Sequence, residues 1–216
     1  MKLAKTQPGT GTRLGHRAVP QPDRQSALVV VDLQNDFFPG GALGVQGANE
    51  MIPLVNEYIR LFHTRGFPVM ATRDWHPPGH CSFTEQGGPW PVHCVQGSRG
   101  AQLHSDLVMP PGTLVISKGT DPKKDAYSGF EGTSLEDRFQ DLGVKTLFVL
   151  GLATDYCVKH TVLDACKKGF RVVVIADAIR GVEAQAGDSE KALQDMQASG
   201  AIKATAKDLG IDPSGL

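Results

Sequence analysis

The sequence predicts one α/β domain built on a doubly wound, mostly parallel sheet with helices on both faces. Its apolar runs are rich in β-branched residues and continuous rather than alternating, which is typical of parallel strands buried on both faces. Helical patterns lie between several of these runs, and such alternation with short links indicates right-handed crossovers. A length of 216 residues suits one domain with a sizeable core. The expected strands are residues 27–32, 68–73, 113–117, 145–151 and 171–176.

Four helices are expected between or after these strands. The first covers residues 49–65, where apolar side chains recur at helical spacing, and Gly66 provides a C-terminal stop. Its start is left open, because Pro53 must lie near the first turn of a helix. A short second helix follows Ser134, which with Asp137 resembles a capping box. The other two helices are expected over residues 155–168 and 190–198.

The composition narrows the classes of function. The formal net charge is −1, so no nucleic-acid partner is expected. No apolar run approaches the roughly 20 residues that span a bilayer, and the N-terminus lacks the apolar core of a secretory signal. Residues 1–26 are polar and are expected to form an arm that is mobile or packs on another subunit, with the domain over residues 27–216. Four cysteines are too few for a disulfide scaffold, which favours a cytoplasmic protein.

Chemically reactive side chains stand at the ends of four expected strands. They are Asp32, Asp74, Lys118 and Cys157. The carboxyl ends of parallel strands form one rim of an open sheet, and ligands bind there. A carboxylate, an amine and a thiol on one rim would form a reaction centre.

Cys157 is the candidate nucleophile. It lies in the first turn of a helix, where the helix dipole and backbone N–H groups favour a thiolate. The N–H groups of Cys157 and of Ala153 are expected to form an oxyanion hole. Asp32 follows a fully apolar strand and is expected to act as the acid/base, with Lys118 holding it in place. Taken alone, each of these residues also fits an ordinary structural role, so the prediction depends on their joint occurrence.

Asp74 and His76 form a candidate metal-binding pair. Residues i and i+2 at the end of an extended segment point to the same side, so both can bind one ion. The third ligand is expected from the irregular stretch 76–111, as either His80 or His93. Such a long loop is usually functional, so it is expected to form a wall or lid of the site. Zinc, manganese and iron all suit this ligand set.

Several motifs in order resemble those of a known family. They are VVVDLQNDFFPGGAL, TRDWHPPGHCSF, WPVHCVQGS, SKG, DAYSGFEGT and GLATDYCV. In this order they resemble the nicotinamidases (pyrazinamidases) of the isochorismatase-like cysteine hydrolases, over roughly residues 27–205. The resemblance implies a six-stranded parallel sheet and the deamidation of nicotinamide to nicotinate and ammonia.

The resemblance also implies roles for individual residues. It makes the Leu152–Ala153 peptide bond cis and assigns the oxyanion hole to the amides of Ala153 and Cys157. The implied cofactor is one divalent metal ion, zinc before iron or manganese. The implied residues are a catalytic triad of Asp32, Lys118 and Cys157, metal ligands Asp74, His76 and His93 with His80 as second choice, and pocket walls Phe37, Trp90 and Tyr127.

These features predict a metal-dependent cysteine amidohydrolase that forms a thioester with nicotinamide, without a membrane partner and with a homo-oligomer as an open question. Three other functions remain to be tested. Another amidohydrolase of the family would act on a carbamoyl or ureido compound. A non-haem iron oxygenase would use Asp74, His76 and a further histidine as a facial triad. A non-catalytic binding protein would leave the thiol and the lysine without a role.

Overall fold

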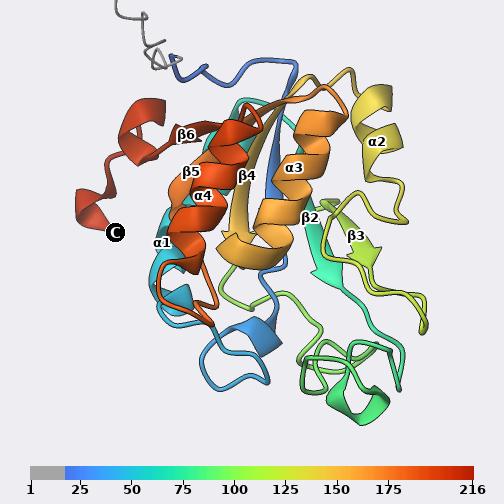
Figure 1. Cartoon of the computed structure of the whole chain (residues 1–216). Coiled ribbons are helices and arrows are strands. Elements are labelled where there is room, and N and C mark those ends of the chain that lie inside the picture. Colours follow the sequence, from blue (N-terminus) through green and yellow to red (C-terminus); the bar gives the residue numbers. More distant parts are fainter. Residues whose placement is uncertain (1–17) are drawn as a thin grey trace, which may run out of the picture.

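Six strands form one sheet in the computed structural model, which describes residues 18–216 (Figure 1). The strand order is β3-β2-β1-β4-β5-β6, and every neighbouring pair is parallel. The predicted doubly wound sheet is therefore confirmed, and it is parallel throughout. The strands are β1 Ser26–Val31, β2 Val69–Asp74, β3 Leu114–Lys118, β4 Thr146–Leu152, β5 Arg171–Arg180 and β6 Ile202–Ala204.

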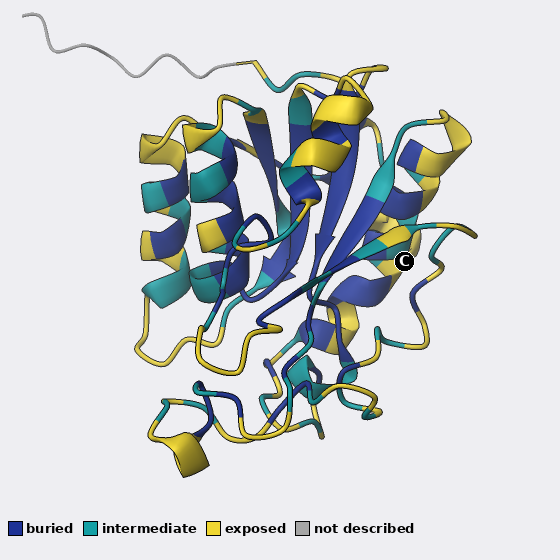
Figure 2. Cartoon of the chain, turned by 90° about the vertical axis from the view of Figure 1, so that its right-hand side faces the viewer, coloured by how far each residue is buried: buried dark blue, intermediate teal, exposed yellow. Residues whose placement is uncertain are grey.

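The central strands are buried on both faces, as their continuous apolar sequences require (Figure 2). Side chains along a strand alternate between the two faces of a sheet. In β1, Leu28 and Val30 join the core on one face, and Ala27, Val29 and Val31 join the core on the other. Two apolar layers thus hold the sheet between its helices.

The helices cover both faces of the sheet. Helix α1 (Ala48–Thr64) packs on one face and lies behind the sheet in Figure 1. The other three helices pack on the opposite face, with α3 and α4 in front of the sheet. They are α2 Leu135–Asp141, α3 Lys159–Lys167 and α4 Asp188–Ala198. Pro53 lies inside α1, in its second turn rather than its first.

One local prediction is wrong, and another holds with a difference at its start. The side chain of Ser134 makes no capping hydrogen bond at α2. Its backbone (φ −92°, ψ 13°) is not extended, which is the conformation that a capping side chain needs. The helix expected over residues 155–168 is not uniform either. A π-helical turn at Thr154–Val158 precedes α3.

The strand order places the candidate site. The connections reverse direction between β1 and β4, and ligands bind beyond the carboxyl ends of strands at such a switch point. Asp32 directly follows β1, and the π-helical turn with Cys157 is separated from the end of β4 by one residue. The irregular loops gather below these strand ends in Figure 1.

Most of the predicted arm, residues 1–17, lies outside the described residues. The described remainder packs on the domain: Val19 contacts the core, and Gln21 donates a hydrogen bond of 2.8 Å to the carbonyl of Asp208. None of the helices in residues 18–216 combines the length and apolar character needed to cross a membrane.

Candidate active site

Asp32, Lys118 and Cys157 meet in the interior, as predicted. The Lys118 Nζ lies 2.9 Å from Asp32 Oδ2 and 3.4 Å from Cys157 Sγ. All three side chains are buried. Asp32 has a φ of 48°, a left-handed conformation uncommon outside glycine, and this bend follows the last residue of β1.

Thr72 orients the Asp32 carboxylate, a contact that the sequence did not reveal. Its hydroxyl donates a 2.6 Å hydrogen bond to Asp32 Oδ1. Thr72 stands two residues before Asp74 in β2, so both side chains lie on the same face of the sheet. The neighbouring strand therefore holds Asp32 as well as supplying Asp74.

Burial and the neighbouring charges shift the pKa values of all three groups in this cluster. Burial raises the pKa of Asp32, and the Lys118 ammonium opposes the shift. Burial alone would lower the pKa of Lys118, but Asp32 and Asp74 raise it well above its usual value. Burial also raises the pKa of the Cys157 thiol, although Lys118 lowers it. Desolvation is the largest of these effects on Cys157, so the buried site favours the thiol over the thiolate that the helix start predicts.

The turn before Cys157 is held tightly against β1. The Leu152–Ala153 peptide bond is cis, as the resemblance implied. Gly151, with a φ of 124°, stands where a Cβ would lie 2.1 Å from the carbonyl oxygen of Val31, so only glycine fits. The Ala153 carbonyl accepts hydrogen bonds from the N–H groups of Tyr156 and Val158. Among the described residues the Ala153 N–H donates to no protein acceptor, so it is free for an oxyanion.

Asp74, His76 and His93 form a second buried cluster beside the first. One ligand atom from each lies within 4.8 Å of the others, and Asp74 Oδ1 is 3.8 Å from His76 Nε2. Lys118 also donates a hydrogen bond to Asp74, so this carboxylate joins the two clusters. Burial lowers the pKa of His76 to about 3, which leaves the ring in the neutral form that binds metals.

The hydrogen bonds of the two histidines fit a metal site. His76 Nδ1 lies 2.9 Å from the carbonyl of Gly119, and His93 Nδ1 lies 2.8 Å from the carbonyl of Pro91. A carbonyl only accepts, so each Nδ1 carries the proton and each Nε2 has a free lone pair. Gly119 is required beside the His76 ring, because a Cβ there would lie 2.5 Å from a ring carbon. The residues therefore suit a divalent ion.

His80 lies outside this cluster. Its Nδ1 is 2.7 Å from Ser82 Oγ and its Nε2 is 3.2 Å from the carbonyl of Lys124, so both ring nitrogens have protein partners. The ring stacks on His76, with centroids 4.2 Å apart. The geometry thus favours His93 over His80 as the third ligand.

Replacing His93 with alanine is expected to weaken divalent-metal binding by more than roughly 100-fold, because a ligand is lost. Replacing His80 with alanine removes only a ring that stacks on His76, and is expected to weaken divalent-metal binding by less than roughly 10-fold. Chelator competition and elemental analysis on both variants measure this. Metal loss in the His80 variant alone would make His80 the third ligand.

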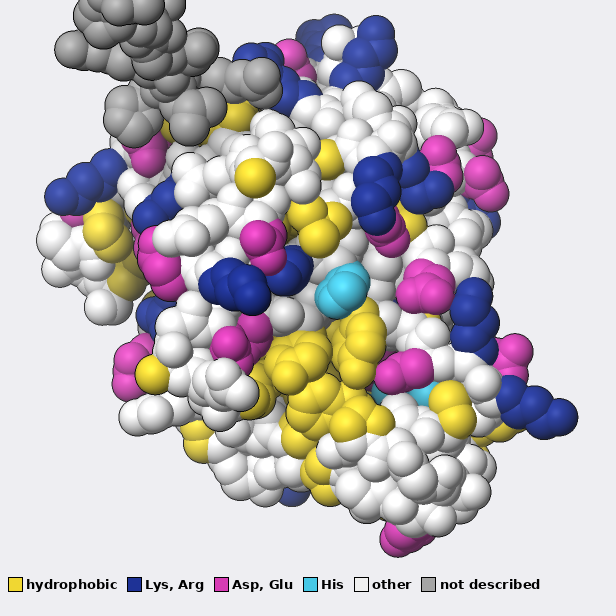
Figure 3. All heavy atoms as spheres, viewed as in Figure 1, with side chains coloured by type: hydrophobic (Ala, Val, Ile, Leu, Met, Phe, Trp, Pro, Cys, Tyr) yellow, Lys and Arg dark blue, Asp and Glu magenta, His cyan; other side chains and the backbone are white. Residues whose placement is uncertain are grey.

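A pocket opens beside both clusters. Its wall includes all three predicted aromatic residues, and Trp90 Nε1 donates a 2.9 Å hydrogen bond to the Tyr127 hydroxyl. Figure 3 shows apolar side chains gathered beneath α3 and α4, at the level of the loops that follow the strands. Leu43, Tyr156 and Val182 also line the pocket and were not predicted, because no sequence motif marks them as site residues. The lining residues are Phe37, Leu43, Asp74, Trp90, His93, Tyr127, Ala153, Tyr156, Cys157 and Val182.

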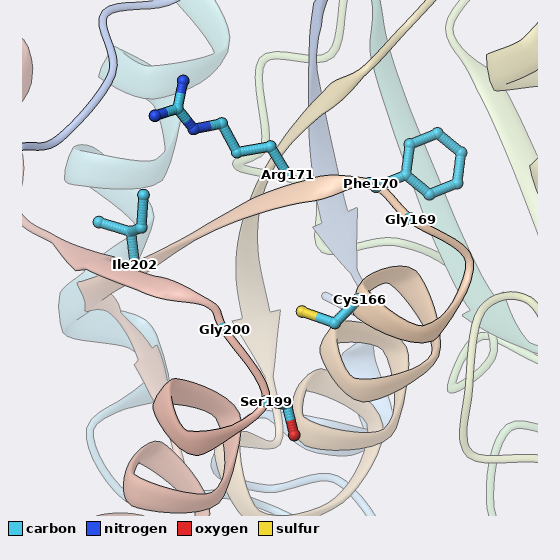
Figure 4. A pocket seen from close by; sticks show the side chains of 7 residues that line it. All are labelled: Cys166, Gly169, Phe170, Arg171, Ser199, Gly200 and Ile202. Carbon is cyan, nitrogen blue, oxygen red and sulfur yellow. The ribbon is translucent and has the colours of Figure 1, made fainter. Parts of the chain in front are cut away.

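A second hollow lies between the ends of α3 and α4, near Cys166 and Gly200 (Figure 4). Phe170 and Arg171, at the start of β5, also line this hollow. Within residues 18–216, no metal-type group of side chains belongs to this hollow. Among the described residues, the groups of side chains that could bind a metal ion lie beyond the carboxyl ends of the strands.

The fold and the site define a parallel-sheet α/β protein with a buried Asp–Lys–Cys cluster beside a candidate metal centre. The Isochorismatase domain family matches residues 26–208, and the chain belongs to this family. The nicotinamidase of Escherichia coli K12 is 44% identical over 203 residues, which cover 84% of this chain and 95% of that protein.

Solved structures agree with this assignment. Pyrococcus horikoshii pyrazinamidase in complex with zinc has a TM-score of 0.81 and 49% identity, with 84% of this chain and 99% of that chain covered. The PnC1 protein of L. infantum in complex with nicotinate has a TM-score of 0.82 and 35% identity, with coverage of 89% and 98%. The predicted isochorismatase-like fold is confirmed.

Proposed function

We propose that this protein is a nicotinamidase, which hydrolyses the carboxamide of nicotinamide to nicotinate and ammonia. One observation carries the proposal: a single pocket is lined by the thiol of Cys157, by aromatic side chains, and by Asp74 and His93 of the candidate metal cluster. One small cavity thus contains a candidate nucleophile, aromatic walls that fit a flat ring, and a candidate metal site that could bind a ring nitrogen. The relatives described above, which include a pyrazinamidase with zinc and a protein with nicotinate, support this substrate class.

Asp74, His76 and His93 would hold one divalent ion, with zinc proposed before iron or manganese. A divalent ion there would supply Lewis-acid chemistry suited to the pyridine nitrogen of the substrate. Phe37, Trp90 and Tyr127 enclose the ring, and the hydrogen bond between Trp90 and Tyr127 keeps their side chains in place. This arrangement directs the carboxamide carbon toward Cys157 Sγ.

In the first half of the reaction, Asp32 takes the proton of the Cys157 thiol as sulfur attacks the carboxamide carbon. The carbonyl oxygen gains negative charge, which the N–H groups of Ala153 and Cys157 stabilise. As the C–N bond breaks, Asp32 returns the proton to the departing nitrogen, which leaves as ammonia. A thioester between Cys157 and the nicotinoyl group remains.

In the second half, Asp32 deprotonates a water molecule, and the resulting hydroxide attacks the thioester carbon. The C–S bond breaks, the proton on Asp32 returns to the thiolate, and the product loses its carboxyl proton to water or to the ammonia and leaves as nicotinate. Burial raises the pKa of Asp32, which suits a group that must both accept and donate a proton. Lys118 orients Asp32 and offsets negative charge throughout.

An ammonia-release assay tests the proposal. The purified protein is offered nicotinamide, pyrazinamide, a carbamoyl amino acid and a ureido acid, and its divalent metal content is measured in the same preparation. Nicotinamide is expected to be the preferred substrate, with about one metal ion per chain in line with a three-ligand site. Turnover of only the carbamoyl or ureido compounds would overturn the assignment. Oxygen uptake with no ammonia release would favour an oxygenase instead.

The cellular setting is part of the proposal. All four cysteines are free, which suits a reducing cytoplasm. Residues 27–216 are proposed as the catalytic domain. A homo-oligomer remains a prediction, to be measured by light scattering.

A further inference from the structure

Gln34 is a buried polar residue that contacts a member of the metal cluster. Its side-chain oxygen accepts a 2.7 Å hydrogen bond from the N–H of Asp74, and its side-chain nitrogen donates a 2.7 Å bond to the carbonyl of Asp74. The same nitrogen donates a 3.0 Å bond to the carbonyl of Ala101. Gln34 is fully buried, so these bonds have no competition from water. Both backbone polar groups of Asp74 are thus held by one side chain.

Asp36 holds the segment that carries His93. Its Oδ2 accepts a 2.7 Å hydrogen bond from the N–H of Cys94, the residue after His93. Cys94 has a φ of 45°, a left-handed conformation that residues other than glycine rarely adopt. The carbonyl of Cys94 accepts a 3.0 Å bond from the N–H of His76. Asp36 therefore stabilises an unfavourable bend that sets the direction of His93 relative to His76.

Gly100 fixes the position of the Asp36 carboxylate. A Cβ on Gly100 would lie 2.1 Å from Asp36 Oδ2 and 2.3 Å from its Cγ. The backbone N–H of Asp36 also donates to the carbonyl of Gly100. The carboxylate thus lies against bare backbone and has no room to move toward it.

We propose that Gln34 and Asp36 are positioning residues for the metal site, acting through the backbone of Asp74 and of Cys94. Neither side chain belongs to the three-residue metal cluster or lines the pocket. Both residues lie in the segment that directly follows Asp32. This short segment therefore fixes the positions of the proposed base, of Asp74 and of the segment that carries His93 relative to one another. Outer contacts of this kind orient ligands and raise metal affinity. The inference rests on the metal site of the proposed function.

The test measures zinc affinity by chelator competition on full-length variants, without relying on turnover. Gln34→Met keeps the length of the side chain but loses its three hydrogen bonds, and Asp36→Ala loses the acceptor for Cys94. Each is expected to weaken zinc binding by roughly 10–100-fold. Asn35→Ala is the matched control: its side chain lies in the same segment, but donates its 2.8 Å hydrogen bond to the carbonyl of Arg99 rather than to the backbone of Asp74 or Cys94. It is expected to bind zinc like the wild type.

Two further variants distinguish positioning from general destabilisation. Asp36→Asn keeps an oxygen acceptor and is expected to restore most of the zinc affinity. Gly100→Ala pushes the carboxylate away and is expected to weaken zinc as Asp36→Ala does. In the Asp36→Ala background the Gly100 change should add little, because the clashing group is gone. If Gln34→Met does not fold, the Asp36 and Gly100 variants carry the test.

The spectrum of the Co²⁺-loaded proteins gives a second readout. A change in the d–d bands of Gln34→Met and Asp36→Ala at saturating metal is expected, whereas lowered stability alone would leave those bands unchanged. Wild-type zinc affinity and unchanged bands in all variants would overturn the positioning roles while leaving the proposed function intact. A wild-type protein that binds neither zinc nor cobalt would overturn the positioning roles together with the metal site.

Discussion

Replacing Cys157 with alanine is expected to reduce nicotinamide turnover by roughly 10⁴–10⁶-fold, as the loss of a nucleophile does in other hydrolases that form acyl-enzymes. The pocket walls and metal cluster remain in this variant, so nicotinamide should still bind. Single-turnover ammonia release measures the first effect, and quenching of tryptophan fluorescence measures the second, since Trp90 lines the pocket. Hydroxylamine added to the wild type should trap the thioester as a hydroxamate, and no hydroxamate should form with the variant.

Cys166→Ala is the matched control for Cys157→Ala. Cys166 is a half-buried free thiol on α3, outside the pocket, and its removal should leave turnover at the wild-type level. If Cys157→Ala kept more than a trace of activity, or if Cys166→Ala lost it, the assignment of the nucleophile would be wrong. Loss of binding along with turnover would instead give Cys157 a role in shaping the pocket.

The location of the reactive side chains at the carboxyl ends of strands could be predicted, because it depends only on the direction of the chain and on the burial of the strands. A continuous apolar run that ends in Asp32, or in Lys118, places that residue on the carboxyl rim of any parallel sheet. Cys157 follows a third such run. The structure brings these three residues together at the switch point between β1 and β4.

The parts that escaped prediction depend on long-range partners. Gln34 looks like an ordinary loop residue until the backbone of Asp74 is placed beside it. Thr72 is a common strand residue, and nothing local shows that its hydroxyl faces Asp32. The resemblance implied a sixth strand, but β6 has only three residues, one of them exposed, so its position could not be read from apolar sequence.

The pKa of the Cys157 thiol is a further property that local sequence does not predict. A helix start in the sequence indicates a stabilised thiolate, since the dipole effect is local. Desolvation depends on everything that covers the site, and here it raises the pKa of the thiol. The proposed mechanism accordingly uses Asp32 as the base while the sulfur of Cys157 attacks.

Replacing Lys118 with methionine is expected to lower the free energy of unfolding by about 3–5 kcal/mol, the usual cost of removing one partner from a buried ion pair. The Lys118 ammonium is fully buried and lies 2.9 Å from Asp32 Oδ2, and it also donates to Asp74. Its removal leaves the two carboxylates close together without the ammonium that pairs with both of them. Turnover should fall as well, since Asp32 loses the group that orients it. Urea denaturation measures the stability, and ammonia release measures the activity.

A second substitution separates the two effects. Asp32→Asn in the Lys118→Met background removes one uncompensated charge and should restore part of the lost stability, but no activity, because the proposed base is gone. Lys159→Met is the matched control: this lysine pairs with Asp195 at 2.7 Å on the surface, where ion pairs contribute little. A Lys118→Met protein as stable as Lys159→Met would show that Asp32 and Asp74 do not depend on the buried ammonium. Full activity in that protein would remove Lys118 from the proposed mechanism.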